Sequence, residues 1–82
     1  MRAITRPRAS AVEPLPEHKL LVTFDNGERR VFDVTPYLDH PAYRELRGST
    51  LFLTVKPAGL SVEWIHGQDI CPDELYYDSV RV

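Results

Sequence analysis

Residue types that carry out chemistry are few in this chain of 82 residues, and they do not stand at the spacing of a common catalytic or metal-binding motif. The histidines are His18, His40 and His66, and the one cysteine is Cys71. Zinc sites use His and Cys at short, repeated spacings, which these four residues do not show. A metal site of His66, Asp69 and Cys71 is one alternative; we nevertheless expect no metal ion and no cofactor.

Cys71 could in principle act as a nucleophile beside a histidine. The neighbouring Asp73 and Glu74 carboxylates would disfavour its thiolate, whereas the N-terminus of a helix would favour it, so the two effects oppose each other. A capping or small apolar role suits Cys71 better. The sequence also holds no Gly-rich phosphate loop, GxSxG motif or Walker pattern. We therefore predict that the protein is not an enzyme and has no catalytic residues.

The segment from Trp64 to Tyr76 has two interpretations. In the structural one, which we favour, Trp64 closes one end of a small core, Gly67 turns the chain at positive φ and Asp69 caps the last helical turn. In the functional one, Trp64, His66 and Asp69 line a pocket for a small polar ligand. These three residues are the candidate ligand or partner surface.

The element that must position these residues is clearest in the segment LLVTFDNGERRVFDV, which reads as a β-hairpin. A two-residue Asn-Gly loop would place Phe24 opposite Arg29 and mix apolar with charged groups on each face. A three-residue loop, ending at Gly27, instead pairs Phe24 with Glu28 and gathers the apolar side chains on one face. We predict this register, with strands over residues 19–24 and 29–34 and Gly27 at positive φ.

Weaker signals complete the fold. Residues 2–13 allow an extended first strand, and Asp39 as N-cap, Pro41 and Gly48 bound a short helix. Alternation predicts strands over residues 51–55 and 60–64, separated by a turn at 56–59, and Pro72 opens a last helical turn. The predicted order is β-β-β-α-β-β-α: an α+β fold with a small, mainly antiparallel sheet and short helices packed on one face. The residues assigned structural roles are Phe24, Gly27, Phe32, Trp64, Gly67, Asp69, Leu75 and Tyr76. One buried cluster is predicted to join Phe24, Phe32, Leu53, Val62 and Trp64.

The composition and charge of the chain indicate which classes of protein it can belong to. The net charge is −2 and 43% of residues are hydrophobic, as in an ordinary globular domain, and we take residues 1–82 as a single domain. No run of about eighteen apolar residues is present, so we expect no membrane span. The N-terminus lacks the apolar core of a secretory signal, and a single cysteine suits a reducing compartment. The expected location is the cytoplasm.

Five arginines deserve a separate interpretation. Arg2, Arg6 and Arg8 lie near the N-terminus, and Arg29 and Arg30 follow the hairpin loop. If the first strand lies beside the hairpin, these side chains could form a positive stripe that binds nucleic acid. Solvated positions on strands and sheet edges also favour arginine, and we prefer that interpretation.

The chain resembles the small bacterial family called domain of unknown function 2442, from about Leu15 to Tyr76. The resemblance is carried by Pro14-Leu15-Pro16, Val22-x-Phe24-x-Asn26-Gly27-Glu28, Phe32-Asp33-Val34, Leu46, Phe52 and Trp64-x-x-Gly67-x-Asp69-Ile70-x-Pro72-x-x-Leu75-Tyr76. It implies the same fold and no established activity. Family members are similar in size to the small partners encoded in toxin–antitoxin-like gene pairs.

Three functions therefore stay open. The first, which we expect, is a non-catalytic protein-interaction module with a regulatory, antitoxin-like role, binding another protein through the sheet face that the helices leave uncovered. The second is a nucleic-acid-associated accessory domain that uses the arginines. The third is a small-ligand binder or enzyme centred on His66 and Asp69. The sequence does not predict the oligomeric state.

Overall fold

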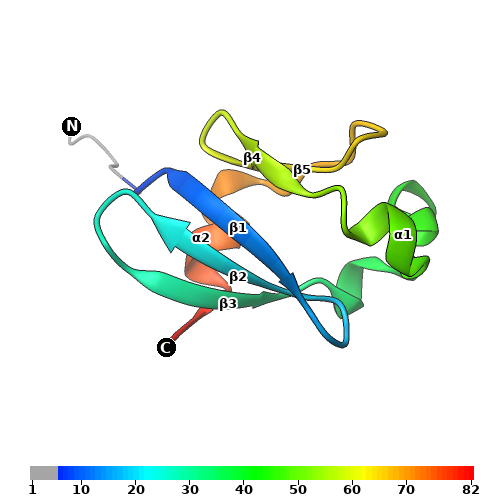
Figure 1. Ribbon diagram of the computed structural model, residues 1–82, viewed down its shortest axis with the longest axis horizontal. Coiled ribbons are helices and arrows are strands. Elements are labelled where there is room, and N and C mark those ends of the chain that lie inside the picture. The colour runs from blue at the N-terminus through cyan, green and yellow to red at the C-terminus, as the bar shows by residue number, and fades with distance from the viewer. Residues whose placement is uncertain (1–5) are drawn as a thin grey trace.

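The computed structural model describes residues 6–82 and shows an α+β fold with two antiparallel sheets (Figure 1). The larger sheet has the order β1-β2-β3-β6, with β1 at Ala9–Leu15, β2 at Lys19–Phe24, β3 at Arg29–Asp33 and β6 at Val80–Arg81. The smaller sheet pairs β4 (Lys56–Ala58) with β5 (Ser61–Glu63). The helices are η1 (Thr35–Tyr37) and η2 (Pro41–Arg47), both 3₁₀, and the α-helices α1 (Ser49–Phe52) and α2 (Pro72–Tyr77). The predicted fold class is confirmed.

The hairpin of β2 and β3 has the predicted three-residue loop. The N–H of Phe24 donates to the carbonyl of Glu28 at 2.8 Å, and the N–H of Gly27 donates to the carbonyl of Phe24 at 2.9 Å. Leu20 lies opposite Phe32 farther along the strands. Gly27 has φ of 89°, which residues with a Cβ rarely adopt. The predicted register is confirmed.

A first strand is present as β1, but it spans Ala9–Leu15 rather than the predicted residues 2–13, of which 2–5 lie outside the described residues. It tolerates a proline because of its register. Pro14 lies opposite Leu20. The bond between Phe24 and Glu28 shows that even-numbered residues of β2 direct their backbone groups to β3. Odd-numbered residues of β2 therefore bond to β1, and the nitrogen of Pro14 points away from the sheet. No ladder hydrogen bond is lost there.

The helix predicted after the hairpin is present as η2, but Asp39 is not its N-cap. The N-cap is His40, whose Nδ1 accepts a hydrogen bond from the backbone N–H two residues later at 3.3 Å. Pro41 explains the difference, because a proline holds the residue before it in the extended conformation that an N-cap needs. Asp39 instead accepts a hydrogen bond from Arg47 at 2.6 Å.

The strand predicted over residues 51–55 is wrong. Residues Ser49–Phe52 form the single helical turn α1, which buries Phe52 and leaves Leu53 63% exposed. The following hairpin also differs, because Ala58 pairs with Ser61 and the chain turns through the two residues between them. An apolar run this short fits the residue period of a strand and that of a helix equally well. The helix forms because it packs Phe52 against the core.

The core lies between the larger sheet, α2 and the β4–β5 hairpin. Phe24, Phe32, Val62 and Trp64 are buried in one cluster as predicted, whereas the prediction for Leu53 is wrong. Leu75 is fully buried and Tyr76 packs against the same cluster, so α2 docks on the sheet as predicted.

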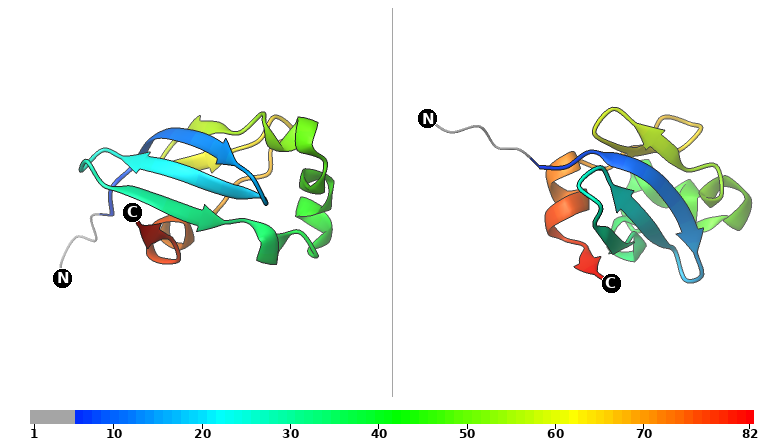
Figure 2. Two further views of the ribbon diagram at one scale, coloured as in Figure 1. Left: turned by 60° about the horizontal axis from the view of Figure 1, so that its bottom comes forward. Right: turned by 60° about the vertical axis from the view of Figure 1, so that its left-hand side comes forward.

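The helix α2 lies on one side of the larger sheet only (Figure 2). The other side faces the viewer in Figure 1 and no helix crosses it. The chain then adds β6, which was not predicted, beside β3. Over residues 6–82, no helix is long and apolar enough to cross a membrane.

Candidate functional site

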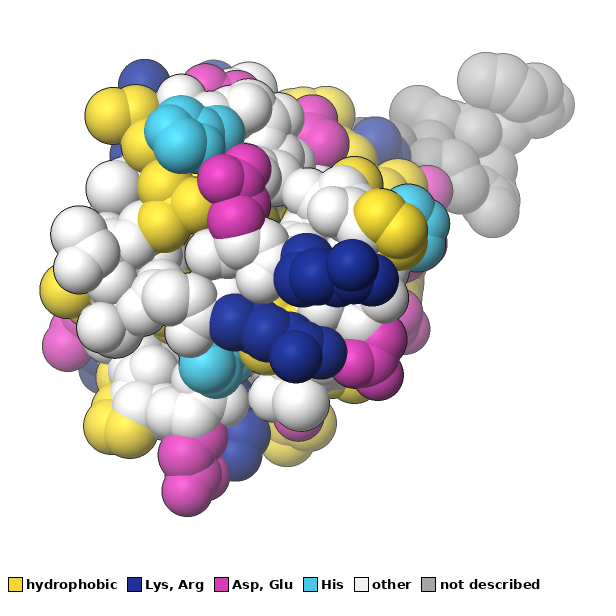
Figure 3. Space-filling model, turned by 90° about the vertical axis from the view of Figure 1, so that its right-hand side faces the viewer, with side chains coloured by type: hydrophobic (Ala, Val, Ile, Leu, Met, Phe, Trp, Pro, Cys, Tyr) yellow, Lys and Arg dark blue, Asp and Glu magenta, His cyan; other side chains and the backbone are white. Residues whose placement is uncertain are grey.

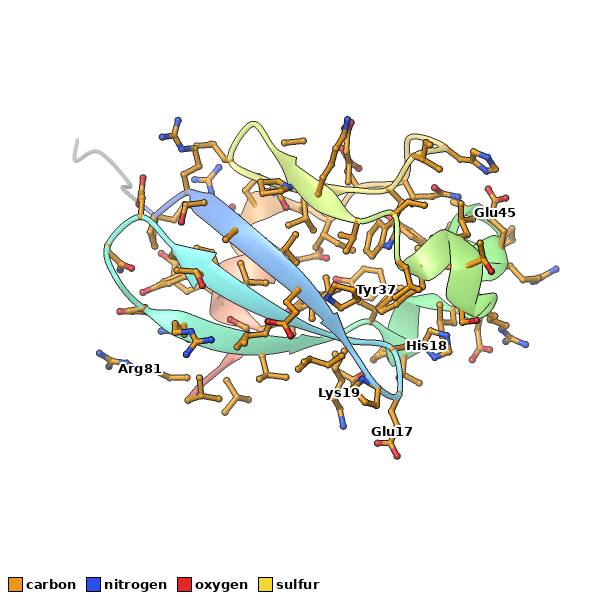
Figure 4. The ribbon with its side chains drawn as sticks, in the orientation of Figure 1. Glu17, His18, Lys19, Tyr37, Glu45 and Arg81 are labelled. Atoms are coloured by element: carbon orange, nitrogen blue, oxygen red, sulfur yellow. The ribbon has the colours of Figure 1, made fainter. Side chains whose placement is uncertain are left out.

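The structure does not bring the predicted surface residues together around a pocket. Trp64 is 0% exposed, and its Nε1 donates to the carbonyl of Phe52 at 3.0 Å, so its indole belongs to the core. His66 is exposed, and its Nδ1 lies 3.0 Å from a carboxylate oxygen of Glu45, which Figure 4 places at the helical end of the molecule. Asp69 is exposed as well.

Asp69 does not have the capping role predicted for it. Its backbone carbonyl accepts a hydrogen bond from the Tyr43 hydroxyl at 2.8 Å, and its carboxylate has no hydrogen-bond partner among the described residues. The N-cap of α2 is the exposed Cys71, which makes no capping bond through its side chain to any residue of 6–82. Gly67, by contrast, has the predicted positive φ, at 95°. Within residues 6–82, no group of three His, Cys, Asp or Glu side chains could hold a metal ion.

The arginines do not form one stripe in the part of the chain that the structure describes. Arg2 lies outside residues 6–82. Arg6 lies 2.9 Å from a carboxylate oxygen of Asp73, and Arg8 approaches Asp25 at 4.0 Å. Arg29 and Arg30 are consecutive in β3 and therefore point to opposite faces of the sheet.

Arg30 belongs to a cluster that ties the hairpin to α2. Its Nε donates to a carboxylate oxygen of Glu28 at 2.8 Å, and its guanidinium lies 4.2 Å from the centre of the Tyr76 ring. The Tyr76 hydroxyl donates to the same oxygen of Glu28 at 2.9 Å. The hydrogen bond from Arg30, followed by that from Tyr76, lowers the pKa of Glu28. This cluster is structural, because its members satisfy one another.

A groove of about 390 Å³ lies between β3 and α2, and we call it the acidic groove. Its lining residues are Phe32, Asp33, Pro36, Tyr37, Glu74 and Asp78. The Tyr37 hydroxyl donates to a carboxylate oxygen of Glu74. Burial, followed by this contact with Glu74, raises the pKa of Tyr37 far above its ordinary value. The phenol is thus neutral at physiological pH and unsuited to act as a general base there.

Asp33 is already engaged at the rim of the acidic groove. Burial opposes its ionisation, but hydrogen bonds from Thr35 outweigh that effect and lower the pKa of Asp33. The backbone N–H of Thr35 donates to its carboxylate at 2.9 Å. The groove therefore carries negative charge and could hold a cationic group.

A second groove, of about 270 Å³, lies at the other end of the hairpin. It is mostly apolar and is lined by Pro14, Leu15, Pro16, Glu17, His18, Ser49, Phe52 and Leu53. The His18 ring stands edge-on to Phe52, and its Nε2 lies 3.1 Å from the carbonyl of Arg47. Figure 3 shows the end of the molecule that carries η2 and α1, where basic, acidic and histidine side chains are interspersed. No single sign of charge dominates the surface in that view.

The uncovered face of the larger sheet is the remaining candidate. We define the uncovered face by the side chains that point away from α2: Ala11, Glu13, Leu15, Lys19, Leu21, Thr23, Arg29, Val31, Asp33 and Val80. Its middle row runs across all four strands, since Glu13 lies opposite Leu21, Leu21 opposite Val31, and Val31 opposite Val80. Val80 is 69% exposed. An apolar row thus lies on the solvent side of the sheet, with charges around it.

The sequence predicted an uncovered sheet face without naming its residues, although two apolar residues indicated where it lies. Leu21 and Val31 occupy hairpin positions where the alternation expects polar residues, and they lie directly opposite each other. The acidic groove had no such signal, because Tyr37 and Glu74 are far apart in the sequence and meet only in the fold.

Comparison with known proteins identifies a family. Residues 9–81 match the family model described as "Protein of unknown function (DUF2442)", a longer stretch than the resemblance seen in the sequence. No curated protein and no solved structure matches the chain. Since the family model covers nearly the whole chain, this protein belongs to the DUF2442 family.

Proposed function

We propose that this protein is a non-catalytic protein-interaction module that binds through its uncovered face. The observation that carries the proposal is the apolar row of Leu21, Val31 and Val80 on the solvent side of the sheet. A sheet with one solvated face normally alternates apolar residues inward with polar residues outward. Apolar groups clustered where water would otherwise lie, inside a polar rim, are typical of a protein-binding surface.

The charges around the apolar row support a protein partner over nucleic acid. Glu13, Lys19, Arg29 and Asp33 contribute two charges of each sign to the uncovered face. Nucleic-acid binding draws on a concentration of Lys and Arg facing the phosphates. A balanced rim suits a protein surface, which presents both signs as well.

The same architecture supports a regulatory role over a catalytic one. The two grooves described above are open, and the neutral phenol of Tyr37 offers no base in the larger of them. A module of this kind acts by covering part of another protein. An antitoxin-like role, in which binding inhibits the product of a neighbouring gene, is one form of such regulation.

The proposal is tested by capturing partners from the native cell with four forms of the tagged protein. The wild type should retain a partner, a second copy of this chain included, and the Val31→Lys variant should lose it. Ile65→Lys is the matched control, because Ile65 is 67% exposed and lies outside the uncovered face. A partner retained by folded Val31→Lys but lost by Glu74→Lys would instead place binding at the acidic groove and overturn the proposal.

A further inference from the structure

We infer that the occupant of the uncovered face is a second copy of this chain, in a two-fold symmetric dimer that stacks the larger sheet of one copy on that of the other. This inference rests on the proposed function, because it names the partner of the same face. The argument depends on how the residues of the face are placed relative to β2 and β3, the two central strands.

The two central strands present three matched rows. Lys19 lies opposite Asp33, Leu21 opposite Val31, and Thr23 opposite Arg29. Consider a two-fold axis parallel to these strands, midway between them and just outside the sheet. Rotation about it places each β2 residue over the β3 residue of the same row in the other copy. An interface of this kind is isologous, so every contact occurs twice.

Each row then meets a complementary row. The Leu21 side chain faces Val31 of the second copy, and Lys19 faces Asp33 of the second copy. Because Lys19 and Asp33 are also neighbours within one copy, the four side chains form a ring of alternating charge. At the other end of the strands, Thr23 meets Arg29 without placing like charges together. Sheets stacked in this way lie about 10 Å apart, with strands inclined by about 30°.

The side chains that would form the charged ring are available. The Lys19 ammonium lies 3.6 Å from Glu17, and the two side chains stand together beyond the end of the strands (Figure 4). The Glu17 side chain is 83% exposed, so this pair is a weak competitor. Asp33 is exposed, and its Oδ1 accepts the backbone bond from Thr35 at 2.9 Å; a carboxylate has acceptor capacity for a lysine as well.

The equal numbers of positive and negative side chains on the uncovered face favour a second copy over a partner that is strongly acidic or strongly basic. A strongly acidic or basic partner would satisfy half of the rim charges and repel the other half. In the rotated copy Lys19 faces Asp33, whereas Arg29 faces Thr23 and Glu13 faces Val80, so no like charges are placed against each other. Its apolar row also covers the Leu21 and Val31 side chains with the same residues.

The area of the face sets the expected strength of the dimer. Three strands of about five residues and the two-residue β6, at about 3.3 Å per residue and about 4.8 Å between strands, outline on the order of 300 Å² per copy. Stable interfaces bury about 800 Å² per partner, so a dimer of this size belongs to the weak, reversible class. Interfaces of about 1,600 Å² in total dissociate at micromolar concentrations or below, so this smaller one should dissociate at roughly micromolar concentrations or above.

Sedimentation equilibrium of the purified 82-residue chain, from about 10 µM to 1 mM within that range, tests the inference. The wild type should pass from monomer to dimer across this range, and Val31→Lys should weaken association at least about tenfold, because an ammonium group would be buried in the apolar centre. Ile65→Lys should leave association unchanged. A wild type that stays monomeric at the highest concentration, or a dimer unaffected by Val31→Lys, would overturn the inference.

Reversing one charge in each of two variants tests whether Lys19 of one copy faces Asp33 of the other. Lys19→Glu and Asp33→Lys should each weaken self-association, because each places like charges together. Mixing the two variants should restore a heterodimer, since each reversed charge then meets its opposite. Circular dichroism must show both variants folded, because Asp33 also accepts a hydrogen bond from the backbone N–H of Thr35. If Asp33→Lys unfolds, the Val31→Lys result decides alone.

The two proposals fail in different ways. A purified chain that stays monomeric, while capture of a different protein from the cell still depends on Val31, would overturn the dimer and leave the interaction module in place. Loss of both effects would overturn both proposals.

Discussion

Trp64 illustrates how a single residue can close a core of this size. Its ring system is fully buried beside Phe52, and its one polar atom is satisfied by the carbonyl of that residue. Burying a large aromatic side chain without leaving its N–H unpaired gives the apolar gain without the cost of a lost hydrogen bond. A small domain depends heavily on such a residue, because its total stability is only on the order of 5 kcal/mol.

Replacing Trp64 with Ala should lower the free energy of unfolding by about 3–5 kcal/mol, the range seen for buried aromatic residues. Urea denaturation followed by circular dichroism should therefore find the variant largely unfolded without denaturant. Trp64→Phe is the control: it keeps most of the apolar contact but leaves the Phe52 carbonyl without its donor, so the loss should be smaller, about 1–3 kcal/mol. A Trp64→Ala protein that melts cooperatively near the wild-type temperature would contradict this account.

Gly27→Ala should cost roughly 1 kcal/mol or more, because a Cβ is disfavoured at its φ of 89°. A Cβ built at Gly27 meets nothing within 4 Å, so the cost would come from the backbone alone. Gly48 provides the comparison, since it has φ of −73° and a Cβ there would stand 3.6 Å from the carbonyl of Glu45. Thermal denaturation should show a clearly larger loss for Gly27→Ala than for Gly48→Ala; equal losses would reject the backbone explanation.

For single residues, the sequence predicts the role correctly where that role depends on residues close by in the sequence. Gly27 and Gly67 were identified because turn geometry demands positive φ at those places. Asp69 was misread as a cap, because the position of the helix start decides which residue can cap it, and that start lies at Pro72. Leu53 was assigned to the core by alternation alone. No local rule could show that the preceding residue, Phe52, would be buried in its place.

At the scale of elements, the contact between the β2–β3 hairpin and α2 predicts how the free energy of unfolding depends on pH. The pKa of Glu28 is lowered from its ordinary value of 4.5 in the folded protein, chiefly by the hydrogen bond from Arg30. A carboxylate with a lowered pKa stabilises the fold above its unfolded pKa, and this contribution is lost as pH falls through its folded pKa. Glu28→Gln should therefore destabilise the protein at pH 7, and the difference from the wild type should shrink in acid.

The measurement is the free energy of unfolding of wild type and Glu28→Gln at several pH values between about 2 and 7, the window in which carboxylates titrate. Glu13→Gln is the matched control, because Glu13 is exposed and lies in β1, away from Arg30 and Tyr76. The control should change stability little at any pH. A constant difference between wild type and Glu28→Gln across the range would show that the lost interaction is not ionic.

Elements were predictable where period and turn chemistry agreed, as in the β2–β3 hairpin. They were not predictable where the conformation of a short apolar run depends on packing against residues distant in the sequence. Residues 51–55 carry alternating apolar side chains, but α1 forms there because one helical turn packs Phe52 against the ring of Trp64. The strand β6 is only two residues long and depends on β3 for its hydrogen bonds, so it left no pattern of its own.

For the whole molecule, the distribution of charge predicts weak affinity for nucleic acid. The net charge is −2, and Arg6, Arg8 and Arg30 each lie beside a carboxylate. Titration with mixed DNA and RNA at low salt should show no binding tighter than tens of micromolar, near the range of non-specific contacts. Tight binding that falls steeply with salt, and is lost when Arg2, Arg6 and Arg8 are changed together, would instead favour a nucleic-acid-associated domain.

The two edges of the larger sheet limit how this protein can assemble. Along β1 the nitrogen of Pro14 faces outward, and the N–H of Ala9 donates to the carbonyl of Leu60 at 3.2 Å, so little of that edge is free to bond another strand. The opposite edge, β6, is two residues long. Polymerisation by strand addition needs long free edges, whereas stacking about a two-fold axis closes after two copies. Both edges therefore offer a second chain too little free backbone for growth into fibres by strand addition.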